Sequence, residues 1–164
     1  MRTPIVFLIT AAALASCSPK APAADGGEAS VSDLKAFIGT WTHKGNIIAP
    51  WLVGPGFLPD PEPEIIEKPL VIGETSSAGP SMLSCETAVY SVTTPGLDGL
   101  FEGKVTDPYI ASSVLGIDKD KIPTLAESCK SPTGDMELNY HLIDKDKLLL
   151  GLNNVVYQFE RAKP

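Results

Sequence analysis

The most regular alternation of hydrophobic and polar residues lies in the C-terminal part of the chain. In residues 136–142, Met, Leu and Tyr alternate with Glu, Asn and His, and a second alternation follows in residues 155–160. Between them, residues 148–152 place leucines on one face, and the Asn-Asn pair at 153–154 is typical of a type I′ hairpin turn. Alternation with period two indicates strands that bury one face and expose the other. The region therefore predicts an antiparallel meander with one wet face.

Shorter apolar runs in the rest of the chain predict additional strands. Ser32 is placed to cap a helical turn at residues 33–38, which Gly39 ends before a strand begins at residues 40–43. Further strands are expected at residues 64–72, 82–93, 97–106 and 122–129, with a loop at 73–80 and with 107–116 left open between a helical turn and a strand. A series of about eight short strands with frequent turns is typical of an all-β fold. We expect a small antiparallel β-barrel with a short N-terminal helical turn, because closure removes exposed sheet edges.

Composition and charge exclude several classes of protein. The 164 residues carry 13 Lys and Arg against 20 Asp and Glu, a formal net charge of -7, which argues against nucleic-acid binding. With 43% hydrophobic and 20% charged residues, the chain is typical neither of a disordered protein nor of a multi-span membrane protein. Its 14 glycines and 15 prolines argue against a helical bundle. One globular domain is the class that this composition fits.

The N-terminus has the pattern of a secretory signal. Arg2 precedes an apolar stretch at residues 5–15, which is shorter than the roughly 20 residues that a membrane-spanning helix needs. The Leu-Ala-Ser-Cys sequence that ends at Cys17 resembles the lipobox of bacterial lipoproteins. The resemblance implies a signal peptide at residues 1–16 and a diacylated Cys17. An ordinary signal peptide cut elsewhere is the alternative, and it would leave Cys17 as a free thiol.

The lipobox resemblance also implies where the protein resides and how it is held. Two or three acyl chains on Cys17 would anchor the protein durably to a membrane. In such lipoproteins an Asp after the cysteine favours the inner membrane, so Ser18 implies the outer membrane, facing the periplasm. Residues 17–32 are rich in Pro, Ala, Gly and Ser and are expected to form a flexible tether. The β-barrel domain would then occupy residues 33–164 of a protein of the bacterial cell envelope.

Processing at the lipobox would leave Cys85 and Cys129 as the remaining cysteines of the chain. In an oxidising compartment we expect these two residues to form a disulfide. The alternative is a redox-active pair, which typically needs a Cys-x-x-Cys motif at the start of a helix. Neither cysteine belongs to such a motif.

A second resemblance is carried by residues 37–41, Phe-Ile-Gly-Thr-Trp. A helical turn followed by Gly-x-Trp resembles the opening of lipocalin-like (calycin) barrels. The chain is also similar to META-type bacterial lipoprotein domains, which combine an early Gly-x-Trp with a mid-chain Cys and a terminal aromatic-x-Arg. The resemblance implies that Trp41 is a core aromatic and that a basic residue near the end of the last strand covers it. Arg161 is the candidate, through a cation–π contact.

Candidate metal-binding and catalytic residues are few. The sequence Asp-Lys-Asp-Lys occurs at residues 118–121 and 144–147, but each Asp is followed by Lys, so charged hairpin turns are expected instead of calcium loops. His43 and His141 are candidates for a shared site, although His141 is expected on the polar face of its strand. The sequence has no His-Glu-x-x-His, Gly-x-Ser-x-Gly or P-loop motif. We therefore expect no metal, no cofactor and no enzymatic activity.

The most distinctive segment is residues 49–63, which hold five prolines together with Trp51, Leu52, Phe57 and Leu58. Because prolines prevent regular strand pairing, a stiff loop at one mouth of the barrel is expected. Large apolar side chains on a loop either fold over the end of a core or face a binding partner. The segment is therefore either a plug that seals the barrel or a contact surface for a ligand or partner.

These features favour a protein that binds and does not catalyse. The leading hypothesis is binding of an apolar small ligand or envelope component at the mouth lined by Trp51 and Phe57. The first alternative is a protein–protein module, such as an inhibitor of a periplasmic hydrolase or an assembly factor. The second alternative is a purely structural envelope lipoprotein.

Overall fold

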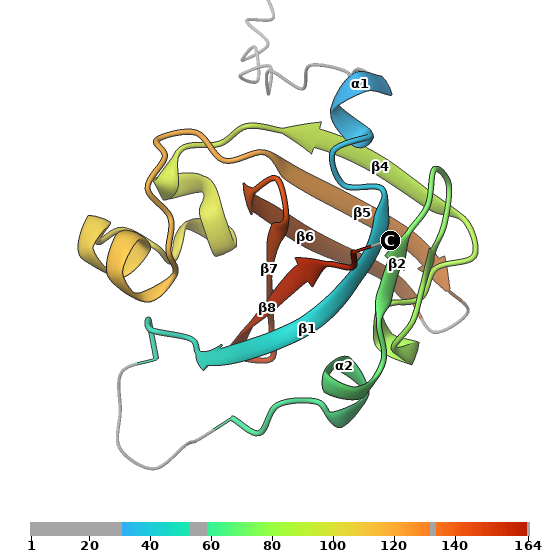
Figure 1. Ribbon diagram of the computed structural model, residues 1–164, viewed down its shortest axis with the longest axis horizontal. Helices are drawn as coiled ribbons and strands as arrows, with labels where there is room; N and C mark the ends of the chain where they lie inside the picture. The colour runs from blue at the N-terminus through green and yellow to red at the C-terminus, as the bar shows by residue number, and fades with distance from the viewer. Residues whose placement is uncertain (1–30, 53–58, 132–133, 164) are drawn as a thin grey trace, which may run out of the picture.

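The computed structural model describes residues 31–52, 59–131 and 134–163, and Figure 1 shows their arrangement. The predicted signal peptide, Cys17 and most of the predicted tether lie outside the described residues, as do Phe57 and Leu58. No helix among the described ranges is long and apolar enough to cross a membrane.

The fold is mostly β, as predicted. Eight antiparallel strands form one sheet in the order β3-β2-β1-β8-β7-β6-β5-β4. The strands are β1 (Gly39–Ile48), β2 (Leu70–Ile72), β3 (Ser77–Ala78), β4 (Ala88–Thr93), β5 (Thr124–Ser131), β6 (Gly134–Asp144), β7 (Lys147–Leu152) and β8 (Val155–Arg161). Short helical segments connect them: α1 (Val31–Leu34), α2 (Pro63–Glu67), the 3₁₀ segments η1 (Ser81–Leu83) and η2 (Leu97–Gly103), and a single π-helical turn, η3 (Ile110–Val114).

The two edges of the sheet come together, so the sheet curls into a nearly closed barrel (Figure 1). Ser77 of β3 forms an antiparallel bridge with Cys85, which precedes β4. Each of these two residues donates its backbone N–H to the carbonyl oxygen of the other, at 2.9 and 2.9 Å. A disulfide between Cys85 and Cys129 ties the same seam to β5, with 5.8 Å between the Cα atoms. The cysteines therefore pair as expected, and they close the barrel covalently.

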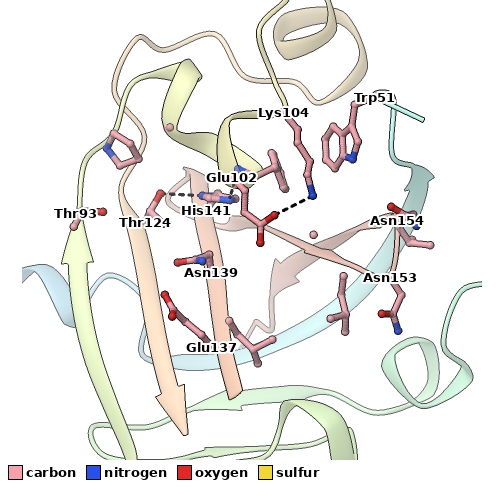
Figure 2. A pocket seen from close by; sticks show the side chains of 17 residues that line it. Trp51, Thr93, Glu102, Lys104, Thr124, Glu137, Asn139, His141, Asn153 and Asn154 are labelled. Atoms are coloured by element: carbon pink, nitrogen blue, oxygen red, sulfur yellow. Dashed lines mark hydrogen bonds and ion pairs between the residues drawn. The ribbon is translucent and has the colours of Figure 1, made fainter. Parts of the chain in front are cut away.

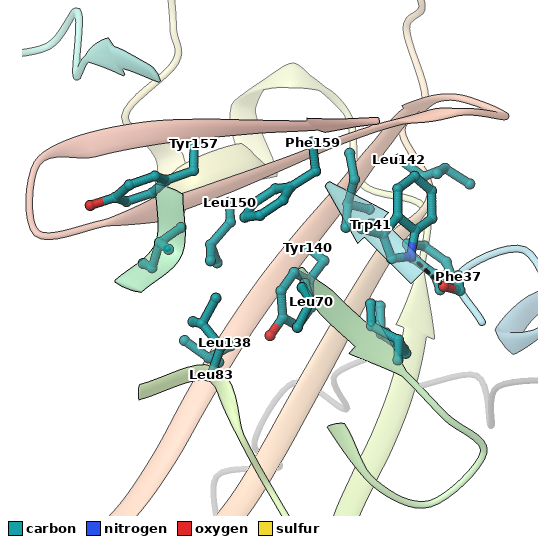
Figure 3. Packing of buried hydrophobic residues seen from close by; sticks show 14 of the residues in the cluster. Phe37, Trp41, Leu70, Leu83, Leu138, Tyr140, Leu142, Leu150, Tyr157 and Phe159 are labelled. Carbon is teal, nitrogen blue, oxygen red and sulfur yellow. Dashed lines mark hydrogen bonds between the residues drawn. The ribbon is translucent and has the colours of Figure 1, made fainter. Parts of the chain in front are cut away.

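Large apolar side chains fill the barrel interior (Figure 3). The largest fully buried ones are Trp41, Tyr140, Tyr157, Phe37 and Phe159. The indole N–H of Trp41 donates to the carbonyl oxygen of Phe37 at 2.8 Å. The guanidinium of Arg161 lies 4.2 Å from the centre of the Trp41 ring, which is the contact that the family resemblance implied.

One carboxylate is buried inside this barrel. Glu127 of β5 is 0% exposed, and burial raises the pKa of its carboxyl. Ser77 carries a single hydroxyl proton, yet its oxygen is within hydrogen-bond distance of both the Leu83 carbonyl oxygen and Glu127 Oε1. One of these two contacts therefore needs a proton from the carboxyl, which is consistent with a neutral Glu127.

A second apolar cluster covers the outer face of the barrel wall, and it corrects the prediction of one wet face. Residues 97–122, which we call the outer cover, pack against β7 and β8 from outside (Figure 1). On the outer face of these strands, Leu149 is 1% exposed and Val156 is 0% exposed. His141 of β6, expected to contact solvent, is 2% exposed. The wall therefore has apolar layers on both of its faces.

The prediction of a strand at residues 97–106 was wrong. This part of the outer cover forms 3₁₀ turns, with Phe101 and Glu102 at φ angles of 49° and 60°. The apolar residues here are irregularly spaced. They cover the outer face of the barrel wall and do not pair as a strand. The open assignment at 107–116 resolves to the π-helical turn of η3.

Two further strand predictions were too long. In residues 64–72 only β2 is extended, because α2 begins with Pro63 at its first turn. Lys68 bonds Glu64 four residues away at 2.7 Å, and Ile65 is the buried side chain of this helix. In residues 82–93 only β4 is a strand, preceded by η1 and the bridge at Cys85.

The strands and the turn of the C-terminal meander are as predicted, although its outer face is covered and not wet. Asn153 and Asn154 have φ angles of 50° and 63°, as the two central positions of a type I′ turn require. The Asp-Lys-Asp-Lys sequence at 144–147 forms the β6–β7 hairpin, with Asp144 opposite Lys147. The second copy, at 118–121, was wrongly predicted as a hairpin and lies in the loop between η3 and β5.

Candidate functional site

A pocket of about 460 Å³ lies on the outside of the barrel wall (Figure 2). Its floor consists of residues from the outward face of β5, β6 and β7, and its roof consists of residues 95–104. We call it the outer-wall pocket and define it by Trp51, Thr93, Phe101, Glu137, Asn139, His141 and the turn at 153–154. The pocket exists because the outer cover leaves part of the wall open.

Three aromatic rings form a continuous row along one side of this pocket. Phe101 lies between the other two, with ring centroids 5.2 Å from Trp51 and 4.5 Å from His141. Trp51 is half-buried, whereas Phe101 is only 7% exposed. Gly151 of β7 allows this arrangement, because a Cβ atom there would lie 2.7 Å from Cδ1 of Phe101. The row therefore presents Trp51 at its accessible end, supported from behind by Phe101.

His141 fixes the roof of the pocket to its floor. Its Nδ1 lies 2.9 Å from Thr124 Oγ1, and the backbone N–H of Phe101 donates to its Nε2 at 3.5 Å. Thr124 Oγ1 in turn donates to the Ile122 carbonyl oxygen at 3.2 Å, so it accepts from the imidazole. Burial lowers the pKa of His141 to about 4. The ring is therefore neutral, with its proton on Nδ1, and both nitrogens are engaged.

Hydrogen-bonding side chains form the other side of the pocket. Glu137 and Asn139 share the outward face of β6 with His141, and Thr93 ends β4 nearby (Figure 2). The side chains of Glu137, Asn139 and Thr93 make no hydrogen bond with another described residue. At the far end, the amide nitrogen of Asn153 donates to Glu62 at 3.2 Å. The pocket thus offers free amide, carboxylate and hydroxyl groups to a ligand.

The charges at the pocket nearly cancel. Lys104 Nζ lies 3.0 Å from Glu102 Oε2, and this ion pair crosses the pocket entrance between the aromatic and polar sides (Figure 2). Glu137 is the other carboxylate of the lining. With His141 neutral, the lining carries two carboxylates against one ammonium, so it has a small negative formal charge.

The residues singled out from the proline-rich segment have different outcomes. Trp51 lines the pocket. It was expected at a mouth of the barrel, but it packs on the outer cluster instead. Leu52 is 37% exposed and does not line the pocket. Phe57 and Leu58 lie outside the described residues.

The two histidines are in different surroundings. His43 of β1 contacts the edges of Tyr157 and Phe159, with ring centroids 6.3 and 6.2 Å away. His141 contacts Phe101 on the outer side of the wall. Among the described residues, no group of three or more His, Cys, Asp or Glu side chains is placed to hold a metal ion.

Sequence reasoning missed most of the pocket. Asn139 and His141 were placed on the correct face of their strand, but that face was expected to be exposed to solvent. Phe101 was assigned to a strand, and Gly151 was not considered. The available signal was the excess of apolar residues in 97–122 beyond what the barrel strands need.

Comparison with known proteins adds no relative. No protein-family model, no curated protein and no solved structure matches the chain.

Proposed function

We propose that this protein is a lipid-anchored lipoprotein of the bacterial cell envelope that binds a small ligand in the outer-wall pocket without catalysis. The lipobox at residues 14–17 supports the anchor. One observation supports ligand binding above all others: a pocket of about 460 Å³ sets an accessible, supported Trp51 opposite unpaired hydrogen-bonding side chains. Small-ligand sites usually combine apolar surface with a few polar groups in this way.

Binding is favoured over catalysis by the state of the pocket histidine. A general base needs a free nitrogen and a pKa near the working pH. Both nitrogens of His141 are engaged, and its pKa is lowered to about 4. The nearest ion pair, Glu102 with Lys104, lies at an exposed rim, where water screens its field.

The ligand site proposed here differs in position from the one expected from the sequence. Large side chains occupy the barrel interior, including Tyr140 and Tyr157 at 0% exposure. A ligand in the outer-wall pocket would instead touch Trp51 and the polar face of β6. The barrel would then serve as a rigid support for a site built on its outside.

A protein partner is the second candidate, and exposed apolar side chains favour it. Ile48 at the end of β1 is 45% exposed, and Leu52, next to Trp51 in the chain, is 37% exposed. A surface of this kind is suited to burial against another protein.

Ligand binding is tested by native mass spectrometry of the protein purified from a bacterial host. We expect a small-molecule adduct on the wild type and on Tyr109→Ala, an exposed aromatic residue outside the pocket. The adduct should be lost in Trp51→Ala. A protein complex in place of the adduct would support the second candidate. Wild-type protein that carries neither would contradict both.

The lipid anchor is tested separately by cell fractionation and by mass spectrometry of the N-terminal peptide. We expect the wild type in the membrane fraction with acyl chains on Cys17, and the Cys17→Ser variant without them. An unmodified N-terminus that begins at another residue would show an ordinary signal peptide instead.

A further inference from the structure

We propose that the ligand of the outer-wall pocket is a neutral saccharide, with one sugar ring stacked on Trp51. This inference rests on the function proposed above and names its ligand class. Three properties of the pocket lead to it: the supported aromatic platform, the unpaired amide and hydroxyl groups, and the near-balance of charge.

The platform is the first property. Trp51 is held 5.2 Å from Phe101, and Phe101 is itself fixed between Gly151 and His141. An aromatic face is electron-rich and attracts polarised C–H groups. One face of a pyranose ring consists of such C–H groups, whereas its rim consists of hydroxyls. A half-buried indole that is already held in place loses little conformational entropy when a ring stacks on it.

The polar side is the second property. The amide of Asn139 offers both a donor and an acceptor, and the hydroxyl of Thr93 does the same. Sugar hydroxyls also donate and accept, so one ligand group satisfies either partner. A wholly apolar ligand would remove water from Asn139 and Glu137 without replacing their hydrogen bonds. Polar groups that lose water without a new hydrogen-bond partner disfavour binding. The polar side therefore selects a hydroxylated ligand over a lipid chain.

Charge is the third property. Lys104 is paired with Glu102 at 3.0 Å, so the neighbouring carboxylate offsets its charge. Glu137 adds a further negative charge to the lining, and His141 is neutral. An anionic ligand such as a phosphate or a fatty acid would meet net repulsion in this pocket. The lining therefore favours an uncharged ligand.

The size of the pocket agrees with a short oligosaccharide. Small-molecule sites have volumes of roughly 300–1,000 Å³. The outer-wall pocket, at about 460 Å³, is in the lower half of this range. It is therefore suited to a short saccharide and not to an extended polymer enclosed on all sides.

The test uses the protein as its bacterial host processes it, purified in a detergent without a sugar headgroup. The probes are maltotriose, cellotriose and chitotriose, with laurate and inorganic phosphate as anionic comparisons. Binding is measured by calorimetry and by tryptophan fluorescence, to which the fully buried Trp41 contributes a constant background. We expect saturable binding of at least one trisaccharide and none of phosphate.

The variants separate stacking from general effects on the fold. Trp51→Ala should weaken saccharide binding about tenfold or more, and Trp51→Phe should retain part of it. Asn139→Ala should weaken binding about fivefold or more. Tyr109→Ala, which changes an exposed aromatic residue outside the pocket, should bind like the wild type. Circular dichroism identifies any variant that is misfolded. If Trp51→Ala is misfolded, the affinity of Trp51→Phe for the saccharide tests the stacking instead.

The outcomes distinguish this inference from the function on which it rests. If laurate binds and no trisaccharide does, the saccharide inference is overturned while ligand binding stands. Saccharide binding that is unchanged in both Trp51 variants would overturn the stacking. If no probe binds and the purified protein carries no small-molecule adduct, the inference and the proposed function both fail.

Discussion

The guanidinium of Arg161 lies 4.2 Å from the centre of the Trp41 ring and closes one end of the barrel. Its terminal nitrogens donate to the carbonyl oxygens of Ile38 at 2.8 Å and Ala36 at 2.6 Å. Its Nε donates to the carbonyl oxygen of Lys145 at 3.2 Å. One side chain thus joins the N-terminal turn, the first and last strands and the β6–β7 hairpin.

Replacement of this arginine should therefore destabilise the fold. We expect Arg161→Met to lower the free energy of unfolding by about 2–4 kcal/mol, because it removes the cation–π contact and leaves carbonyl groups unpaired. Arg161→Lys should recover less than half of the loss, since an ammonium cannot reproduce the planar set of donors. Urea unfolding measures both effects. Lys163→Ala, at a neighbouring exposed position, is the control, and an equal loss there would contradict the argument.

The protonation state of His141 should make stability depend on pH. Burial lowers its pKa from 6.5 to about 4, so between these values the unfolded chain binds a proton that the folded chain does not. Stability is therefore lost as the pH falls from about 6.5 to 4, by up to about 3 kcal/mol. Unfolding curves across this range should show a steeper decline for the wild type than for His141→Leu. Equal slopes for the two proteins would show that another group is responsible.

The buried carboxyl of Glu127 should have the opposite pH dependence. Its pKa is raised above 4.5, so as the pH rises through this value the unfolded chain ionises while the folded chain keeps its proton. Stability is lost as the pH rises, until the folded pKa is passed. Glu127→Gln keeps a hydrogen-bond partner for Ser77, through its amide N–H, and cannot ionise, so it should gain stability relative to the wild type as the pH rises. Glu86→Gln, at an exposed position before β4, should show no such gain.

The disulfide should be a large part of the stability of the fold. In a Cys17→Ser variant, the unfolded and unreduced protein should show no free thiol. Cys85 and Cys129 are 44 residues apart, and a loop of this length predicts a loss of about 4 kcal/mol when the bond is removed. Thiol titration followed by unfolding with and without reductant measures both quantities. A positive thiol count would contradict the pairing.

Gly151 should control the position of the aromatic row. An added Cβ would lie 2.7 Å from Cδ1 of Phe101, so Gly151→Ala forces this ring and Trp51 to move. We expect a loss of about 1–3 kcal/mol and a shift in tryptophan fluorescence. The control is Gly45→Ala, whose Cβ would meet only the flexible side chain of Gln158, at 3.0 Å. A fluorescence shift in Gly45→Ala but not in Gly151→Ala would contradict this role of Gly151.

The sequence predicts the barrel and its C-terminal meander because their signals are local. Alternation in residues 136–142 and 155–160 reports the face that points into the barrel, and the Asn153–Asn154 pair fixes the turn between β7 and β8. The Trp41–Arg161 contact could be predicted for a different reason, because its prediction came from a family resemblance at both ends of the domain.

The outer cover could not be predicted in the same way. Its apolar residues have neither a period of two nor a period of 3.6, and they become buried only when a finished wall is present. The positive φ angles at Phe101 and Glu102 occur at residues that give no local signal for them. The outer-wall pocket depends on this cover, and its lining comes from segments distant in sequence. Its position is therefore set by tertiary packing, and sequence patterns report only its separate parts.

The disulfide also determines how the molecule would respond to a protease. The outer cover lies entirely between Cys85 and Cys129, and its lysines at 119 and 121 are exposed. A single cut by trypsin in this loop would leave both fragments linked through the disulfide, with the aromatic row still attached to the wall. The cut would be invisible on a non-reducing gel and would appear as two bands after reduction. Limited digestion can therefore map the exposed part of the outer cover in a molecule that stays assembled.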